Sequence, residues 1–351
     1  MNFPTNSMNS IVVRGTNWIG DAVMQIPALR ELRRIFPSAH ITLHTRSWAQ
    51  GIFADTEFVD ELLTFEKSES KIKDALEQAK ILREKKFDLA VLFPNSFESA
   101  LIAKLAGIPQ RFGYAKDARG FLLTSAVEIP EWKNERHEVF YYLNLVAEVE
   151  KRIVGAETVL AKEPKIDLKV SAERRARARE ILTESGVDFS RKIVALGVGS
   201  TNSRAKRWSA ESYAKLNDKL QNESNMNVIL VGVKDELEVS NEVYEQSKNK
   251  PIILTGKTDL AEATAILSEI DMLVSNDMGL AHIASAVGTK TLVIFGPTNP
   301  QTTRPWNAEI FYKSVECSPC MLRDCPIDHR CLTRISADEV FEKSKLILAM
   351  N

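Results

Sequence analysis

The stretch 272–300 constrains the fold most, because it contains every part of one βαβ unit. An apolar run at 272–274 ends in a polar turn that contains Asp277, and an alanine-rich helical pattern then continues to Gly288. A second apolar run at 291–295 follows. Strand, turn, helix and strand in this order predict two parallel strands, and such units bind ligands at the carboxyl ends of their strands.

The polar turn before this predicted helix is suited to an anion. The free N–H groups and the positive end of the helix dipole face such a turn, and Gly279 lets backbone approach closely, so phosphate is the most natural ligand. The carboxylate of Asp277 would repel phosphate, and it is better suited to accept hydrogen bonds from hydroxyls of a sugar or ribose. The alternative is that Asp277 only caps the helix. The pattern leaves both interpretations open.

The size and charge of the chain exclude several classes of protein. A length of 351 residues favours two domains, and 44% hydrophobic with 26% charged residues is ordinary for a globular protein. The formal net charge of −1 gives no global basic field, so we expect no nucleic-acid partner. No apolar run approaches the roughly 18 residues of a spanning helix. The first ten residues lack a basic segment followed by an apolar core, so we expect no secretion signal and a cytoplasmic protein.

The N-terminal strand at 11–13 leads into a loop with a carboxylate at its end. Gly15 and Gly20 have the spacing of a phosphate loop, but Asp21 stands where that motif needs lysine, which excludes a nucleotide-triphosphate loop. A carboxylate at the mouth of the first βα turn suits a general base. The alternative is an acid favoured at a helix start by the dipole. The pattern after Asp21 predicts one helix up to Phe36, with Pro27 in or near its first turn.

The rest of the chain alternates strand and helix patterns, with about five strands in the second half. This predicts an α/β protein with two Rossmann-like, doubly wound domains that face each other across a cleft. The predicted boundaries are 1–155 for the first domain, 156–172 for the linker, 173–335 for the second domain and 336–351 for a C-terminal helix that starts with a capping box.

The loop 197–208 of the second domain combines glycines, hydroxyls, three cations and an indole between a predicted strand and a predicted helix. It therefore offers both backbone donors and point charges to a diphosphate. A different cluster, the cysteine-rich segment 317–331, contains all four cysteines. Its thiolates have the residue types of a structural zinc site, but it lacks two separated C-x2-C pairs, so reduced or oxidisable thiols are the alternative. The cysteines are Cys317, Cys320, Cys325 and Cys331.

These motifs together resemble those of the bacterial lipopolysaccharide heptosyltransferases, the glycosyltransferase family nine enzymes that use ADP-heptose. The resemblance covers nearly the whole chain, and its most specific parts are residues 14–22, 206–208, 276–282 and 295–298. Residues 94–97 and 106–113 are most similar to the heptosyltransferase II branch of the family. The resemblance implies a GT-B fold with the acceptor on the N-terminal domain, the ADP-sugar on the C-terminal domain, and no required cofactor. The absence of a D-x-D motif agrees with metal independence.

The resemblance also implies roles for individual residues. Asp21 matches the general base, Lys206 the diphosphate-binding lysine and Asp277 the residue at the donor sugar. Glu236 matches the acid that holds the adenosine ribose, with Asp235 as the competing choice. Position 278 departs from the pattern, because many relatives have a hydroxyl there. The implied donor-binding residues are Ser200, Thr201, Lys206, Arg207, Glu236, Asp277, Met278, Gly279 and His282, although His282 is equally explained as a packed helix residue. The implied acceptor-binding residues are Gly20, Asn95, Arg111, Lys116 and Arg119.

The implied reaction is inverting, metal-independent transfer of heptose from ADP-heptose onto heptosyl-Kdo-lipid A, as the second heptose of the lipopolysaccharide inner core. The partners would be ADP-heptose and the lipid-linked acceptor, with peripheral contact at the cytoplasmic face of the inner membrane. The alternatives are a first-heptose transferase, a glycosyltransferase with another nucleotide sugar or acceptor, and a non-catalytic nucleotide-sugar-binding module. An NAD-dependent oxidoreductase is disfavoured because G-x-G-x-x-G is missing.

Overall fold

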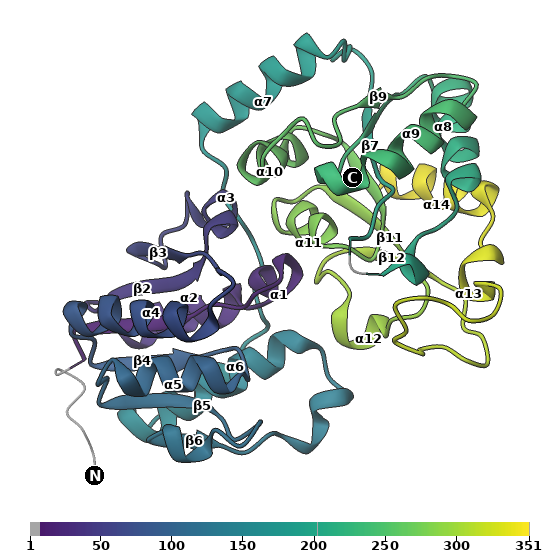
Figure 1. Cartoon of the computed structure of the whole chain (residues 1–351). Helices are drawn as coiled ribbons and strands as arrows, with labels where there is room; N and C mark the ends of the chain where they lie inside the picture. The colour runs from purple at the N-terminus through teal and green to yellow at the C-terminus, as the bar shows by residue number, and fades with distance from the viewer. Residues whose placement is uncertain (1–7, 202, 351) are drawn as a thin grey trace. The chain divides into compact units, whose positions relative to one another are not determined.

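The computed structural model describes residues 8–201 and 203–350, which divide into two compact units, Met1–Ile166 and Asp167–Asn351. Residues 1–7 and Asn202 lie outside the described residues. The expectation that the chain has no secretion signal concerns the first of these segments, and the predicted diphosphate loop contains Asn202. Each unit is an α/β layer structure around its own sheet (Figure 1).

The first unit contains a six-stranded parallel sheet in the order β3-β2-β1-β4-β5-β6. Its strands are β1 (Ser10–Arg14), β2 (His40–Arg46), β3 (Glu61–Phe65), β4 (Leu89–Leu92), β5 (Gln110–Tyr114) and β6 (Ser125–Val127). Its α-helices are α1 (Ile19–Met24), α2 (Ile26–Ile35), α3 (Gln50–Phe53), α4 (Lys71–Lys85), α5 (Phe97–Leu105) and α6 (Glu138–Val149). The strand order reverses between β1 and β4, which is the point where doubly wound sheets bind ligands.

The helices of the first unit cover both faces of this sheet. Helices α4 and α5 pack together on one face, and α2 packs against α6 on the other. The apolar side chains between the sheet and the α4–α5 layer form one continuous core with Val12, Leu82, Leu92 and Ile102 among its members. Strands covered on both faces are apolar throughout, which explains why β1 and β4 are continuous hydrophobic runs in the sequence.

The segment after Asp21 forms two helices, so the prediction of a single helix is wrong. Helix α1 ends and α2 begins around Gln25, and Pro27 lies in the first turn of α2. Proline lacks an N–H and its ring clashes with the carbonyl four residues before it, so a helix through Pro27 would lose a bond to Val23. At the first turn of a new helix that N–H is not needed.

The second unit repeats the architecture with the order β12-β11-β10-β7-β8-β9, again parallel throughout. Its strands are β7 (Ile193–Gly197), β8 (Asn227–Leu230), β9 (Ile252–Ile253), β10 (Met272–Asn276), β11 (Lys290–Phe295) and β12 (Glu309–Tyr312). Its α-helices are α7 (Ala172–Glu184), α8 (Ala210–Ser224), α9 (Leu237–Gln246), α10 (Leu260–Ser268), α11 (Gly279–Ala286), α12 (Pro300–Thr303), α13 (Arg330–Thr333) and α14 (Ala337–Ala349). The strand order reverses between β7 and β10, and β12 is one strand more than the sequence predicts.

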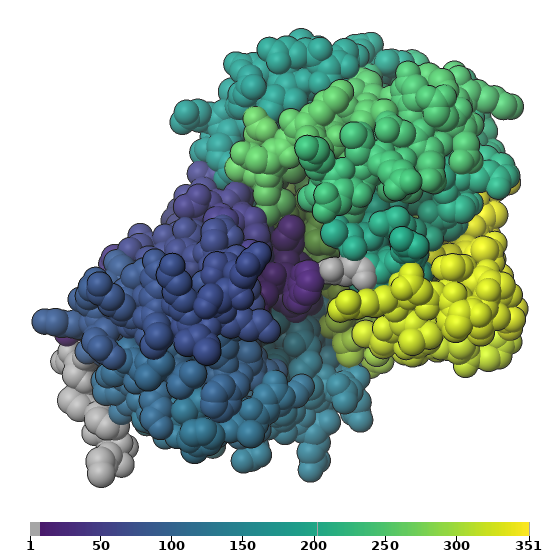
Figure 2. Space-filling view, in the orientation of Figure 1, coloured from purple at the N-terminus to yellow at the C-terminus, as the bar shows by residue number. Residues whose placement is uncertain are grey.

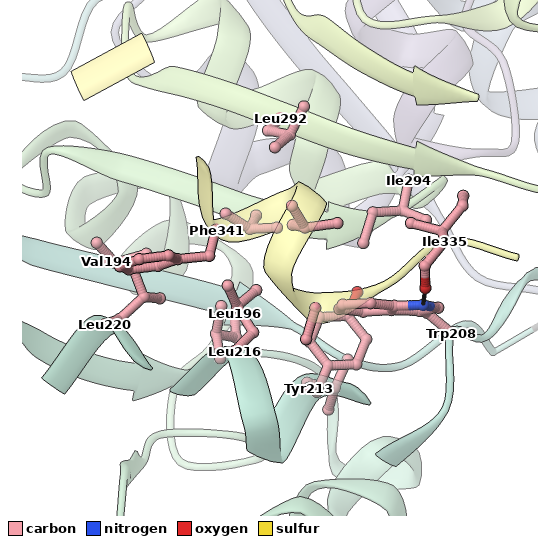
Figure 3. Packing of buried hydrophobic residues seen from close by; sticks show 14 of the residues in the cluster. Val194, Leu196, Trp208, Tyr213, Leu216, Leu220, Leu292, Ile294, Ile335 and Phe341 are labelled. Atoms are coloured by element: carbon pink, nitrogen blue, oxygen red, sulfur yellow. Dashed lines mark hydrogen bonds between the residues drawn. The ribbon is translucent and has the colours of Figure 1, made fainter. Parts of the chain in front are cut away.

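The core on the α8–α14 face of this sheet fixes the C-terminal helix to the Rossmann-like unit. Trp208 and Tyr213 pack edge to face, and both are at most 1% exposed. The indole N–H of Trp208 donates to the carbonyl of Ile335 at 3.0 Å, just before α14 (Figure 3). Ser336 and Glu339 form the predicted capping box at the start of α14. Together the two sheets confirm the predicted GT-B class of α/β fold with two Rossmann-like domains.

Candidate active site

In the second unit, the candidate site lies at the carboxyl ends of the adjacent strands β7 and β10. Asn276 ends β10 and is fully buried. Its amide nitrogen donates to the carbonyls of Val198 and Gly199 at 2.8 and 3.1 Å. Its amide oxygen accepts from the backbone N–H of Trp208 and from the hydroxyl of Tyr213, both at 3.0 Å. Asn276 therefore ties the loop after β7 to the end of β10.

Two donors meet on one carboxylate oxygen beside this clamp. The ammonium of Lys206 lies 2.7 Å from Oδ2 of Asp277, and the hydroxyl of Thr298 donates to the same oxygen at 2.8 Å. Asp277 is 7% exposed, and the N-cap of α11 is Met278. The interpretation of Asp277 as only a helix cap is therefore wrong. The sequence-predicted diphosphate lysine and donor-sugar carboxylate lie in direct contact.

A buried carboxylate lies in the same loop region. Glu236 is 2% exposed, and its oxygens accept from the backbone N–H of Val233 at 3.1 Å and from the hydroxyl of Thr201 at 3.3 Å. A side chain at Gly199 or Gly232 would overlap this carboxylate, since a Cβ there would lie 2.2 and 2.5 Å from atoms of Glu236. Burial raises the pKa of Glu236, although these hydrogen bonds act to lower it. Two glycines thus make room for a carboxylate that can accept hydroxyl groups.

The other predicted donor residues lie around these two carboxylates. Asp235, the competing choice for Glu236, is exposed. The guanidinium of Arg207 donates to the backbone carbonyl of Ser200 at 3.1 and 3.3 Å, which folds the loop after β7 back on itself. Helix α11 carries the remaining three, with Met278 at its N-cap, Gly279 as its first residue and His282 within it, 5% exposed.

The cysteine-rich segment supports both loops of this site. The backbone N–H of Ala205 donates to the carbonyl of Arg323 at 2.9 Å, and the hydroxyl of Ser203 donates to the same carbonyl at 3.1 Å. The N–H of Met321 donates to the carbonyl of Pro297, next to Thr298, at 2.9 Å. Figure 2 shows these C-terminal residues, in yellow, on the surface of the second unit beside the teal residues that follow β7.

The four cysteines are free thiols, and burial together with the nearby thiols raises the pKa of Cys331. Across residues 8–201 and 203–350, no group of three or more His, Cys, Asp or Glu side chains is arranged to hold a metal ion. The structure thus does not gather these thiols into the four-ligand site that the sequence offers as one interpretation.

In the first unit, Asp21 lies at the corresponding reversal of strand order, after β1. It is half-buried in the first turn of α1, one residue after Gly20. Its Oδ1 accepts a hydrogen bond from the hydroxyl of Tyr142 at 3.0 Å. Tyr142 belongs to α6 and is 4% exposed. A partly accessible carboxylate held by a buried donor has the geometry of a positioned base.

The predicted acceptor-binding residues divide into buried and exposed groups. Arg119 is fully buried, and its guanidinium donates to the carbonyls of Tyr114, Pro94 and Ser96. The resemblance implies that Arg119 binds the acceptor, but its charge is satisfied by loop carbonyls inside the unit. Arg119 therefore shapes the loop after β4 rather than facing a solvent-borne anion.

The remaining acceptor candidates lie around that loop. Arg111 is half-buried and donates to the carbonyls of Leu122 and Ile108, and burial lowers its pKa. Asn95 donates to the hydroxyl of Tyr141 at 3.1 Å. Among these residues, Lys116 is exposed, and Asn95 and Arg111 are both half-buried.

Sequence reasoning missed three residues that organise these sites: Asn276, Thr298 and Tyr142. Asn276 and Thr298 lie inside the motifs that carry the family resemblance, and the pairing of Asn276 with Asp277 was a usable signal. No sequence signal marked Tyr142, because it lies 121 residues from its partner along the chain.

Comparison with known proteins finds a family model, curated relatives and a solved structure that match most of the chain. The family model described as Glycosyltransferase family 9 (heptosyltransferase) matches residues 75–330. Lipooligosaccharide heptosyltransferase 2 of Campylobacter jejuni is 28% identical over 96% of this chain and 98% of its own length. Lipopolysaccharide heptosyltransferase 2 of Escherichia coli is 27% identical over 84% of this chain and 85% of its own. The solved structure of E. coli ADP-heptose lipopolysaccharide heptosyltransferase II superimposes with a TM-score of 0.82 at 25% identity, covering 97% of this chain and 98% of that one.

Proposed function

The chain belongs to glycosyltransferase family 9, and from that premise we propose that it transfers heptose from ADP-heptose to the inner core of lipopolysaccharide. We propose further that it adds the second heptose, onto an acceptor that already carries one, as the names of its relatives suggest. The observation that carries the proposal is the contact of Lys206 and Thr298 with Asp277 where strand order reverses in the second sheet.

This arrangement supplies the groups that a nucleotide diphosphate sugar needs. Lys206 provides a cation for the diphosphate, and the start of α11 at Gly279 provides backbone N–H groups. Asp277 accepts hydroxyls of the transferred sugar. The carboxylate of Glu236, which occupies the space that Gly199 leaves, accepts the ribose hydroxyls.

We propose Asp21 as the general base. The acceptor oxygen attacks the anomeric carbon as its hydroxyl proton passes to the carboxylate of Asp21. The bond between that carbon and the diphosphate oxygen breaks, and ADP leaves from the opposite face, so the configuration inverts. Lys206 stabilises the charge that develops on the diphosphate, which is the role a metal ion has in other glycosyltransferases. We therefore propose that transfer needs no divalent ion, and activity should persist in EDTA.

The proposed acceptor is lipid A-linked, which would bring the protein to the cytoplasmic face of the inner membrane through its substrate. In the described part of the chain, no helix has both the length and the apolar character to span a bilayer. The exposed Lys116 and the half-buried Asn95 and Arg111 are the groups proposed to meet the acceptor. Flotation with vesicles that carry the acceptor, against vesicles without it, would test substrate-dependent contact.

The zinc hypothesis for the cysteine-rich segment has its own test. Metal analysis of reduced, purified protein should give stoichiometric zinc if the four thiols rearrange around an ion. Substoichiometric metal together with four titratable thiols would support reduced cysteines that only brace the donor loops.

The deciding experiment measures ADP release from ADP-heptose with heptosyl-Kdo-lipid A and, in parallel, with Kdo-lipid A. Release with the first acceptor supports the proposal, and release only with the second makes the protein a first-heptose transferase. Asp21→Asn keeps an acceptor for Tyr142 but loses basicity, and it should lower kcat by about 10²-fold or more.

Tight ADP binding without release on either acceptor would favour another donor sugar or a binding module. Thermal stabilisation by NAD rather than ADP would favour an oxidoreductase.

A further inference from the structure

The hydrogen bond from Tyr142 to Asp21 has no part in the reaction as proposed so far. The phenol oxygen lies 3.0 Å from Oδ1 of Asp21, and the two residues come from α6 and α1, 121 residues apart. Helix α6 packs against both α1 and α2, so the phenol reaches the carboxylate from the packed side of the unit.

Tyr142 is held so that it can only donate. Its ring packs edge to face against Phe93, with centroids 5.3 Å apart at 70°, and it is 4% exposed. Burial, and then the charge of Asp21, raises the pKa of the phenol well above its ordinary value. The hydroxyl is therefore neutral throughout the working pH range and keeps its proton available to the carboxylate.

We propose that Tyr142 is a positioning residue for the catalytic carboxylate, which fixes one oxygen of Asp21 and stabilises its ionised form. This inference rests on the proposed role of Asp21 as the base. An O–H bond to an ionised carboxylate is stronger than a neutral one, and it favours the charged form. The base is thereby kept deprotonated at lower pH and prevented from rotating away from the acceptor hydroxyl.

Tyr142 donates to Asp21 directly from α6. The other titratable groups that act on this phenol are Glu138 and Tyr141, also on α6, and Glu138 is paired with Lys133.

Tyr142→Phe removes one oxygen and keeps the ring contacts. Without the donor the carboxylate should protonate more readily, so the acid limb of the kcat/KM profile should move up by about one pH unit. At neutral pH kcat should fall about 10-fold, and the KM for ADP-heptose should stay unchanged because the donor residues lie in the second unit.

The matched control is Tyr114→Phe. Tyr114 is also buried in the first unit, and its hydroxyl donates to the carbonyl of Tyr141 at 2.7 Å and accepts from Asn144 at 3.0 Å. A purely structural effect of losing a buried hydroxyl would appear in both variants, but the acid limb should move only in Tyr142→Phe. An acid limb that stays in place in Tyr142→Phe, or moves equally in both, overturns the proposal.

Two further measurements keep the inference separate from the proposed function. The titration of Asp21 can be followed by NMR of protein labelled with ¹³C at the aspartate carboxyl, with Asp21→Asn for assignment. A higher Asp21 pKa in Tyr142→Phe supports the bond even if no transfer activity is found, and an unchanged one overturns it. If Tyr142→Phe does not fold, difluorotyrosine at position 142 is a stronger donor and should move the Asp21 titration to lower pH, and no movement overturns the proposal.

Discussion

The ammonium of Lys206 and Oδ2 of Asp277 lie 2.7 Å apart. The cation proposed to bind the diphosphate is thus already partnered by a carboxylate from the next strand of the sheet. An incoming diphosphate must share Lys206 with Asp277, and it approaches a negative charge as it does so. If Lys206 binds the diphosphate as proposed, Asp277 should oppose binding of the nucleotide alone and favour a ligand whose sugar hydroxyls engage its carboxylate.

Asp277→Asn separates these two effects. Removing the negative charge should leave Lys206 fully available, so ADP should bind about 2- to 10-fold more tightly. Transfer should fall by 10-fold or more, because the amide is a weaker acceptor for the sugar hydroxyl. Calorimetric titration with ADP and steady-state turnover measure the two quantities. Lys206→Met is the counterpart, and it should weaken ADP binding. Weaker ADP binding by Asp277→Asn would contradict this division of roles.

Thr298→Val tests whether the hydroxyl of Thr298 orients the carboxylate of Asp277. Valine keeps the shape but loses the 2.8 Å hydrogen bond, so turnover should fall about 3- to 10-fold while ADP affinity is preserved. The matched control is Thr302→Val on α12, whose hydroxyl donates to the carbonyl of Asn299 at 3.2 Å, and this variant should have normal turnover. An equal loss of ADP affinity would indicate general damage to the loop.

The parallel sheets were predictable because their strands are short apolar runs separated by glycine, proline and polar turns. β7 is buried throughout and β1 is buried from Ile11 onward, and their central residues are accordingly apolar. The edge strand β12 escaped prediction, because its burial is only partial and its sequence lacks a clear period. The break between α1 and α2 was missed because the apolar pattern continues through Gln25, and only the backbone geometry at Pro27 decides it.

Positions of site residues along the chain were predictable, but their partners were not. The location of Asp277 just before a helix was compatible with a cap, but the N-cap of α11 is Met278, and the carboxylate of Asp277 instead contacts a lysine 71 residues away. Arg119 follows a loop pattern that usually exposes a cation, yet three carbonyls brought together by the tertiary fold bury it. Such contacts depend on the register of the whole sheet, which a single sequence does not state.

Glu150 should contribute to stability by closing the end of the first unit. It is 2% exposed, and it accepts from Arg34 and from the hydroxyl and backbone N–H of Thr158. Burial acts to raise its pKa, but these bonds lower the pKa of Glu150 to about 2. Because the folded-state pKa is depressed, this stability is present above the ordinary value of 4.5 and is lost as the pH falls towards 2.

Glu150→Gln should therefore lower the free energy of unfolding at pH 7 by about 1–2 kcal/mol, a reduced figure because Arg34 is solvent-accessible and screened. Denaturant unfolding at neutral and acid pH measures it, and the difference should shrink towards pH 2. Glu148→Gln, which removes a surface pair with Arg152, should cost less than about 0.5 kcal/mol. Equal effects of the two variants would show that Glu150 has no special role.

The contribution of Glu236 to stability should change with pH in the opposite sense to that of Glu150, because the pKa of Glu236 is raised and not lowered. Burial disfavours the ionised form, so as pH rises from the ordinary value of 4.5 through the folded-state value, the unfolded chain releases its proton first and stability falls. Glu236→Gln keeps an oxygen for the N–H of Val233 and removes the buried charge. Without ligand, its melting temperature at pH 7 should match or exceed that of the parent, and the gain should disappear below about pH 4.5.

The stabilisation of Glu236→Gln by ADP should nevertheless fall, because the ribose hydroxyls lose a charged acceptor. Asp235→Asn is the matched control, since this neighbouring carboxylate is exposed and should leave both measurements unchanged. If Glu236→Gln destabilises the ligand-free protein at pH 7 and keeps the full response to ADP, the carboxylate serves the fold of its loop and the ribose is held elsewhere.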